Sequence, residues 1–348
     1  MKRVIALAGI LVLLVSVVIF FRNQEDASKV LRVVTWSGYY PDSILTEFTK
    51  KTGIQVELSY ISSNEELLAK IKAGARGFDI IQPSDYMIEQ MIRLNMLQPL
   101  DKTLLNHLKH IENYYFNLSY DPGLVFTVPF VRGTTGILIN TERVKLTEGD
   151  ISWELLFKSP DPRHTSLLDD MREVFSAVLY WQGKDPNCND PKILEEIAKE
   201  IAKVKSQIAL FSSEPQTLLM RGDVTIAHAF STHGLQIAVD YPHIKYFLPK
   251  EGNSVWTDNF AIPVGSRKTL EAHQFINYFL DPDNALSLVQ ANHLATPNRS
   301  AKAKLPSAMQ KDILLYPTDK QLRAMSFLHI LEDEGLSAMI RLWTEVKS

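Results

Sequence analysis

Hydrophobic positions over residues 33–92 alternate between strand-like and helix-like spacing. Short β-branched or aromatic runs at 33–36, 54–60 and 78–81 predict strands. Between them the apolar residues return every three or four positions, as in Ile44 and Phe48, which predicts amphipathic helices. This strand–helix–strand–helix order predicts an α/β layered domain.

Capping residues mark where several of these helices begin and end. Pro41 suits the first turn of a helix that Gly53 would end. Residues 62–66 (SSNEE) form a capping signature before a second helix. Asp190 and Pro191 predict the start of a third, which carries apolar residues at helical spacing as far as Val204.

The rest of the chain continues the pattern without a break. We predict strands at 137–139, 224–230, 244–248 and 260–262, and a helix with Leu270, Phe275 and Phe279 on one face. No repeat, low-complexity segment or flexible linker separates the parts. Two α/β units joined without a linker suggest two lobes that are connected by crossing strands, with a cleft between them.

The N-terminus has the pattern of an export signal. A basic start, Met1-Lys2-Arg3, precedes an unbroken apolar run over residues 4–21, and polar residues follow. The run lacks a small-residue cleavage site, and a retained anchor of this length could just cross a bilayer. We therefore interpret residues 1–30 as either a signal peptide or an N-terminal membrane anchor, with the soluble remainder outside the cytoplasm.

Composition narrows the class of partner. The formal net charge is −3, so the balance does not indicate a nucleic acid or an anionic membrane as partner. Cys188 is the only cysteine, which excludes an intrachain disulfide, a multi-cysteine zinc site and a lipoprotein anchor.

Four segments resemble the ligand-contacting stretches of the spermidine/putrescine-binding proteins of bacterial ABC importers. They are 35–39 (TWSGY), 82–86 (QPSDY), 168–175 (LDDMREVF) and 255–263 (VWTDNFAIP), in the family's order and at similar separations. Residues 295–298 (ATPN) and 315–317 (LYP) resemble further landmarks, and the similarity extends from about 31 to 319.

The resemblance implies an architecture and a role. The fold class is α/β, a two-lobed type II periplasmic binding protein with hinge-crossing strands. Residues 31–134 plus 257–302 would form lobe 1, and 135–256 plus 303–348 lobe 2. The chain would be a periplasmic monomer, tethered to the inner membrane if residues 1–30 are an anchor, that binds a polyamine and docks on ABC permease and ATPase subunits. It would be no enzyme, and it would need no cofactor or metal.

The family's binding residues also carry over to matching positions. A polyamine needs carboxylates for its ammonium groups and aromatic faces for its methylenes and for cation–π contact. Phe230 stands where the family has a tryptophan, and Arg172 is expected to point away from the site. The implied contacts are Trp36, Ser37, Tyr39, Ser84, Tyr86, Asp170, Glu173, Phe230, Trp256 and Asp258.

Departures from the family pattern bear on which polyamine is bound. Putrescine-preferring relatives carry acids where this chain has Gly38 and His233, and the family's C-terminal polar contact falls near Leu328 or His329. The three remaining acids would match the three charges of spermidine, which favours spermidine over putrescine.

Plainer interpretations of single residues stay open at this point. Ser84 or Asp85 could simply be the N-cap of the following helix. Asp169, Asp170 and Glu173 could form a solvated helix start, where negative charge suits the helix dipole. A lone tryptophan after a strand is usually a core residue.

Some features of the sequence also fit other functions. Paired carboxylates could serve a hydrolase, but no nucleophile elbow, Walker loop or dinucleotide fingerprint accompanies them. The pairs His107/His110 and His228/His233 lack the spacing of a recognised metal site. A ferric binder would need tyrosine-rich ligation in place of tryptophans. A sensory binder for another cationic solute, which never feeds a transporter, remains the alternative.

Overall fold

A computed structural model describes residues 29–74, 77–159, 164–205, 208–331 and 333–348. The predicted signal or anchor therefore lies almost wholly outside the described residues. Within them, no helix is both long and apolar enough to span a bilayer.

Strands from both halves of the molecule form one mixed sheet. In the described part of the chain, ten strands are joined, with the main order β2-β1-β3-β9-β4-β7-β5-β6. The strands are β1 Val30–Thr35, β2 Gln55–Tyr60, β3 Ile80–Ile81, β4 Thr127–Asn140, β5 Thr165–Leu168, β6 Ile208–Ser212, β7 Ile226–Phe230, β8 Ile244–Phe247, β9 Asn253–Ala261 and β10 Met325–Ser326.

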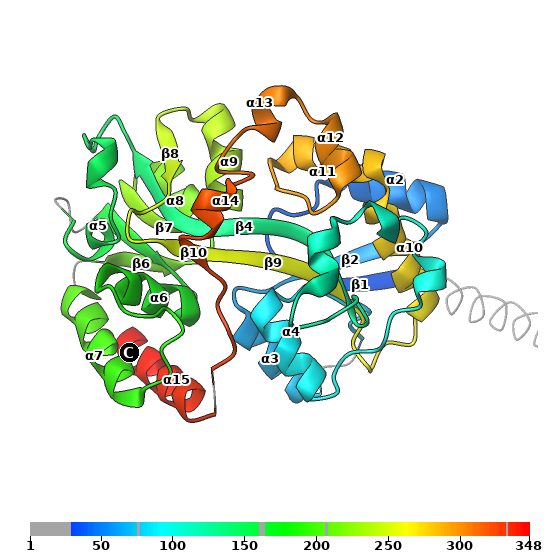
Figure 1. Cartoon of the computed structure of the whole chain (residues 1–348), viewed down its shortest axis with the longest axis horizontal. Helices are drawn as coiled ribbons and strands as arrows, with labels where there is room; N and C mark the ends of the chain where they lie inside the picture. Colours follow the sequence, from blue (N-terminus) through cyan, green and yellow to red (C-terminus); the bar gives the residue numbers. More distant parts are fainter. Residues whose placement is uncertain (1–28, 75–76, 160–163, 206–207, 332) are drawn as a thin grey trace, which may run out of the picture.

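Helices cover the sheet in each half (Figure 1). The α-helices are α2 Asp42–Thr52, α3 Asn64–Lys72, α4 Asp85–Arg93, α5 Glu154–Phe157, α6 Met171–Trp181, α7 Pro191–Val204, α8 Pro215–Arg221, α9 Ser231–Asp240, α10 Thr269–Leu280, α11 Pro282–Asn292, α12 Arg299–Lys304, α13 Ser307–Gln310, α14 Asp319–Leu322 and α15 Asp333–Lys347.

Local sequence signals predict several helix ends correctly. Gly53 ends α2 in the left-handed conformation, at φ 73°, which glycine adopts without steric cost. Ser63 caps α3 by accepting a hydrogen bond from the Glu66 backbone N–H, and Asp190 caps α7 in the same way through Lys192.

Strands β4 and β9 connect the two halves, as the prediction of crossing strands requires (Figure 1). They pair antiparallel as far as Thr134 and Val255. From Thr135 onward β4 pairs with β7, and from Ile137 it also pairs with β8. The sequence pattern marked only residues 137–139 of β4 and 260–262 near the end of β9. Nearly every residue of both strands is buried, so the polar–apolar alternation of a half-exposed strand is missing.

Each of the two halves has a hydrophobic core of its own. In one half, Phe48, Phe275 and Phe279 belong to a cluster beneath α2 and α10. In the other, Trp153 and Phe175 belong to a cluster that α6, α7 and α15 cover. Each half therefore has a core of its own, as expected of two lobes around a cleft.

Candidate functional site

A cavity of about 450 Å³ lies between the two halves. Its walls follow the ends of β1, β2, β3, β5, β6 and β7, where open α/β sheets usually bind ligands. The crossing strand β9 forms a further wall. All ten residues that the sequence predicted for the site line this one cavity: Trp36, Ser37, Tyr39, Ser84, Tyr86, Asp170, Glu173, Phe230, Trp256 and Asp258.

Asp258 lies on β9, with hydroxyl donors on both carboxylate oxygens. Ser84 Oγ donates to Oδ1 at 2.6 Å, and the hydroxyl of Tyr39 donates to Oδ2. Burial raises the pKa of Asp258 to about 7, although these two hydrogen bonds favour the charged form. The carboxylate is therefore held in place and is poised to gain from a nearby cation.

The start of α4 differs from a simple cap. Ser84 occupies the N-cap position, but its hydroxyl makes no capping bond and serves Asp258 instead. Asp85 is the first residue of the helix, 3% exposed, and it lines the cavity. Its carboxylate accepts from the backbone N–H groups of Tyr86 and Thr257. Ser84 is thus the N-cap residue, as one interpretation of the sequence had it, but its hydroxyl serves Asp258 and does not cap the helix. The Asp85 carboxylate divides its hydrogen bonds between its own helix and β9.

Asp170 and Glu173 lie together at the start of α6. Asp170 is the N-cap residue and accepts from the Glu173 backbone N–H at 3.1 Å, while Ser254 Oγ donates to Glu173 Oε2 at 2.6 Å. Burial is the main cause that raises the pKa of Asp170 to about 6 and that of Glu173 to about 8, and the charge of Asp170 raises Glu173 further. These acids are buried, so the interpretation as a solvated helix start is wrong for both.

Arg172 also lines the cavity, against the expectation that it points elsewhere. Its side chain is 1% exposed, and Nη2 donates to Asn187 Oδ1 and to the His329 carbonyl oxygen. Nε and Nη1 have no hydrogen-bond partner among the described residues. The reason lies in the fold: the segment around His329 returns to α6 and fixes the guanidinium beside the acids.

Glu65 is a titratable group near the cavity that the sequence pattern did not mark. The hydroxyl of Tyr86 donates to its Oε1 at 3.2 Å, and its Oε2 is sealed from solvent without a partner in the described structure. Burial and then the charge of Asp170, which belongs to the other half, raise the pKa of Glu65 to about 7. Nothing local identifies it, because its helix position resembles an ordinary acidic first turn.

Aromatic rings form the apolar part of the wall. Phe230 and Trp256 meet edge to face with ring centroids 5.7 Å apart, and Trp36 Nε1 donates to the Gln82 carbonyl oxygen. Gly133 makes room for the indole, since a Cβ at this position would lie 2.3 Å from Trp256 Cζ2. Leu328 lines the cavity where the family has a polar contact.

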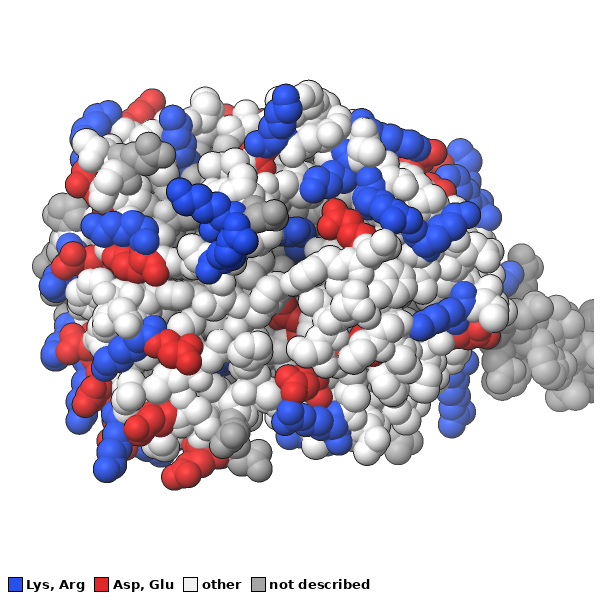
Figure 2. All heavy atoms as spheres, viewed as in Figure 1, with Lys and Arg blue, Asp and Glu red and all other residues white. Residues whose placement is uncertain are grey.

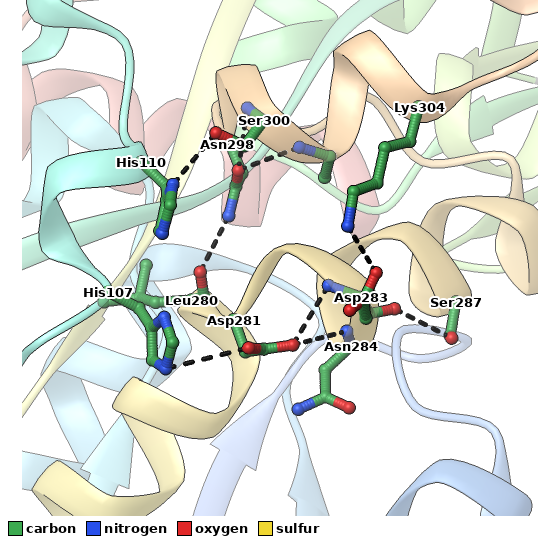
Figure 3. Close-up of polar contacts among 11 residues, drawn as sticks. His107, His110, Leu280, Asp281, Asp283, Asn284, Ser287, Asn298, Ser300 and Lys304 are labelled. Carbon is green, nitrogen blue, oxygen red and sulfur yellow. Dashed lines mark hydrogen bonds and ion pairs between the residues drawn. The ribbon is translucent and has the colours of Figure 1, made fainter.

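The two histidine pairs do not assemble a metal site. Figure 3 shows His107 facing Asp281, at 3.7 Å from nitrogen to oxygen, and His110 bonded to Ser300. His228 is buried against Trp153, whereas His233 lines the cavity. Among the described residues, no group of three or more His, Cys, Asp or Glu side chains could hold a metal ion.

Comparisons with known proteins agree with this architecture. Residues 43–317 match the bacterial extracellular solute-binding protein family. The spermidine/putrescine-binding periplasmic protein 1 of Haemophilus influenzae is 35% identical over 84% of this chain and 82% of its own length. The putrescine-binding periplasmic protein SpuD of Pseudomonas aeruginosa is 30% identical over 93% of this chain and 94% of its own length.

A solved structure is similar to this fold as well. The structure titled "Putative spermidine/putrescine ABC transporter from Listeria monocytogenes" superposes on this chain with a TM-score of 0.86 at 30% sequence identity. The match covers 92% of this chain and 99% of the Listeria chain. The predicted fold class is thus confirmed, and so is the prediction of a binding protein in place of an enzyme. The chain belongs to the bacterial extracellular solute-binding proteins, in the group that includes the periplasmic spermidine/putrescine-binding proteins.

Proposed function

We propose that this chain captures a polyamine in the cavity between its lobes, prefers spermidine to putrescine, and delivers it to the permease of an ABC importer. One observation carries the proposal: buried carboxylates from both halves and six aromatic side chains surround a single cavity. The carboxylates can pair with the ammonium groups of a polyamine, and the aromatic faces can pack against its methylene chains. The names of the relatives support the class of ligand and the transporter.

The electrostatics of the cavity support a cationic ligand. Asp170, Glu173 and Asp258 are each less than 10% exposed, and Arg172 is the only Lys or Arg among the described residues that line the cavity. On the face in Figure 2, by contrast, basic and acidic side chains are mixed over the surface, and basic ones outnumber acidic ones at the upper right. The strong excess of acid therefore belongs to the cavity and not to this outer face.

The expected affinity is within reach of these contacts. A micromolar ligand corresponds to about −8 kcal/mol of binding free energy. Cation–π contacts contribute about 0.5–2 kcal/mol each, and charge pairs that become buried on closure add to this after ordering costs are met.

The preference for spermidine rests on the charge count. The acids that line the cavity offer a partner to the third ammonium group of spermidine, which putrescine lacks, and an unpaired buried charge costs several kcal/mol. The named relatives include putrescine binders, so the preference itself needs a direct test.

We propose that the lobes comprise residues 31–134 plus 257–302 and residues 135–256 plus 303–348. In support, the pairing of β4 with β9 ends at Thr134 and its pairing with β7 begins at Thr135. We place the protein in the periplasm as a monomer, with residues 1–30 as its signal or anchor.

Competitive calorimetric titration with spermidine, putrescine and spermine tests the proposal. We expect micromolar or tighter binding of spermidine and weaker binding of putrescine. Putrescine binding as tightly as spermidine would overturn the preference, and failure of all three to bind would overturn the function. Growth on a polyamine as sole supply, with and without the protein, tests delivery to a transporter.

A further inference from the structure

Glu214 crosses the mouth of the cavity. It lies in the turn between β6 and α8, where Ser212 Oγ accepts a hydrogen bond from its backbone N–H. From there its Oε1 accepts from Ser37 Oγ at 2.7 Å, and nearby Gln236 Nε2 donates to the Gly38 carbonyl oxygen. Glu214 is exposed, whereas the other proposed ligand acids are buried, so its carboxylate stands at the open end of the same cavity.

Arg172 is the only Lys or Arg among the described residues that line the cavity with Glu214, and it is held by Asn187 and the His329 carbonyl oxygen. His233 lines the cavity next to it at 7% exposure, and its Nδ1 has no partner in the described part of the chain. Burial lowers the pKa of His233 to about 4, with only partial compensation from the charge of Glu214, so the ring is neutral at pH 7. A carboxylate and a neutral imidazole suit an ammonium group, which brings only donors.

An apolar wall connects this corner with the deep acids. The Phe230 ring lies 6.0 Å from that of His233 and 5.7 Å from that of Trp256, between ring centroids. Trp256 and Asp258 are two residues apart on β9 and so face the same side of the strand. A chain of methylenes along Phe230 would thus have an acid near each end.

The deep acids provide two ammonium sites and not three. Asp170 and Glu173 are neighbours whose charges oppose each other, so the pair carries less than two full charges near neutral pH. Together they suit one ammonium group, and Asp258 suits a second. A diamine is then satisfied in the deep part of the cavity, whereas a triamine has one ammonium left for the mouth.

We propose that Glu214, assisted by His233, binds the terminal ammonium at the mouth and is the residue that distinguishes long polyamines from diamines. The proposal rests on the polyamine-binding function given above. Gly38 and His233 replace the acids of putrescine-preferring relatives in this corner of the cavity. Glu214, which lies in the lobe opposite Gly38, thereby supplies an acid there.

Calorimetry on Glu214→Gln with spermidine and putrescine tests this role. We expect a loss of at least tenfold in spermidine affinity and less than threefold in putrescine affinity. Glu66→Gln is the matched control, because Glu66 lines the same cavity but is already paired with Lys70 at 2.6 Å; both ligands should bind it within twofold of wild type. Ser37→Ala removes the hydrogen bond that joins Ser37 to Glu214 across the lobes, and it keeps the Glu214 carboxylate.

The outcomes are distinct. If Glu214 served only to hold the lobes together through Ser37, Glu214→Gln and Ser37→Ala would lower the affinities for spermidine and for putrescine by the same factor. That result would overturn the proposal. An unchanged spermidine affinity in Glu214→Gln would overturn it too. Either result leaves the polyamine function intact as long as the wild-type protein binds, whereas a wild type that binds no polyamine contradicts that function. Since Glu214 is exposed, the thermal midpoint of Glu214→Gln should equal that of wild type.

Discussion

Ser84 Oγ lies 2.6 Å from Oδ1 of Asp258, a residue 174 positions further along the chain. Asn64 holds the serine in turn, since its Oδ1 accepts from the Ser84 backbone N–H and its Nδ2 donates to Oγ. The carboxylate of β9 is thereby oriented by the start of α4, which fixes it before a ligand arrives. Such preorganisation reduces the ordering cost of binding.

Asp258→Asn should weaken spermidine binding at least tenfold, or about 1.4 kcal/mol. The substitution removes the charge but keeps the shape, and an amide can still bond Ser84 and Tyr39 after a hydroxyl rotation. Isothermal titration gives the affinity, and the thermal midpoint of the empty protein serves as the folding control. An unchanged affinity would count against the assigned role of Asp258.

Phe230→Trp should leave binding intact or make it tighter. The larger ring extends the apolar wall and restores the residue of the resembling family, with an added face for cation–π contact. Titration with spermidine measures the effect. A large loss of affinity would mean that Phe230 does not form the wall proposed for it.

Gly133→Ala should displace the indole of Trp256 and lower polyamine affinity. The new Cβ would meet the Trp256 ring at 2.3 Å, and overpacking of this kind costs about 1–3 kcal/mol. Intrinsic fluorescence should report the shift of the indole. Gly265→Ala is the control, because no atom lies within 4 Å of its added Cβ. If the two variants had the same fluorescence and the same polyamine affinity, Gly133 would not be needed to make room for the Trp256 indole.

Binding should release on the order of one proton at pH 7. In the empty protein, burial raises the pKa of Asp258 to about 7, that of Glu65 to about 7 and that of Glu173 to about 8. A cation stabilises the charged carboxylates, so a proton must leave as the ligand enters. Affinity should therefore rise with pH between about 6 and 8 and fall as the carboxylates become protonated.

Titration in two buffers of different ionisation enthalpy measures this release. The apparent binding enthalpy should differ between the buffers at the same pH. Asp258→Asn should reduce the difference, because one of the titrating groups is gone. An enthalpy that is the same in both buffers would show that the carboxylates are already charged in the empty protein.

Much of the cavity could be predicted because its residues sit in contiguous segments. Trp36, Ser37 and Tyr39 lie in one loop, and Asp170 and Glu173 in one helical turn, so the match to a family pattern places each group as a unit. The other cavity groups have no such local mark. Asp85 and Arg172 look like an N-cap and a solvent-facing charge until Thr257 and His329 approach them from distant segments.

The sequence by itself determined the helices with clear caps and the α/β order, since capping and hydrophobic spacing act within a few residues of the chain. The segments that meet the cavity were predicted from their resemblance to the polyamine-binding family. Only the tertiary structure decided that β4 and β9 run unbroken through both halves, that Glu65 lies near Asp170 of the facing lobe, and that Glu214 bonds Ser37 of the facing lobe. The physical reason is that burial on both faces removes the periodic pattern, and that a charge acquires its role from neighbours which only folding brings within a few ångströms.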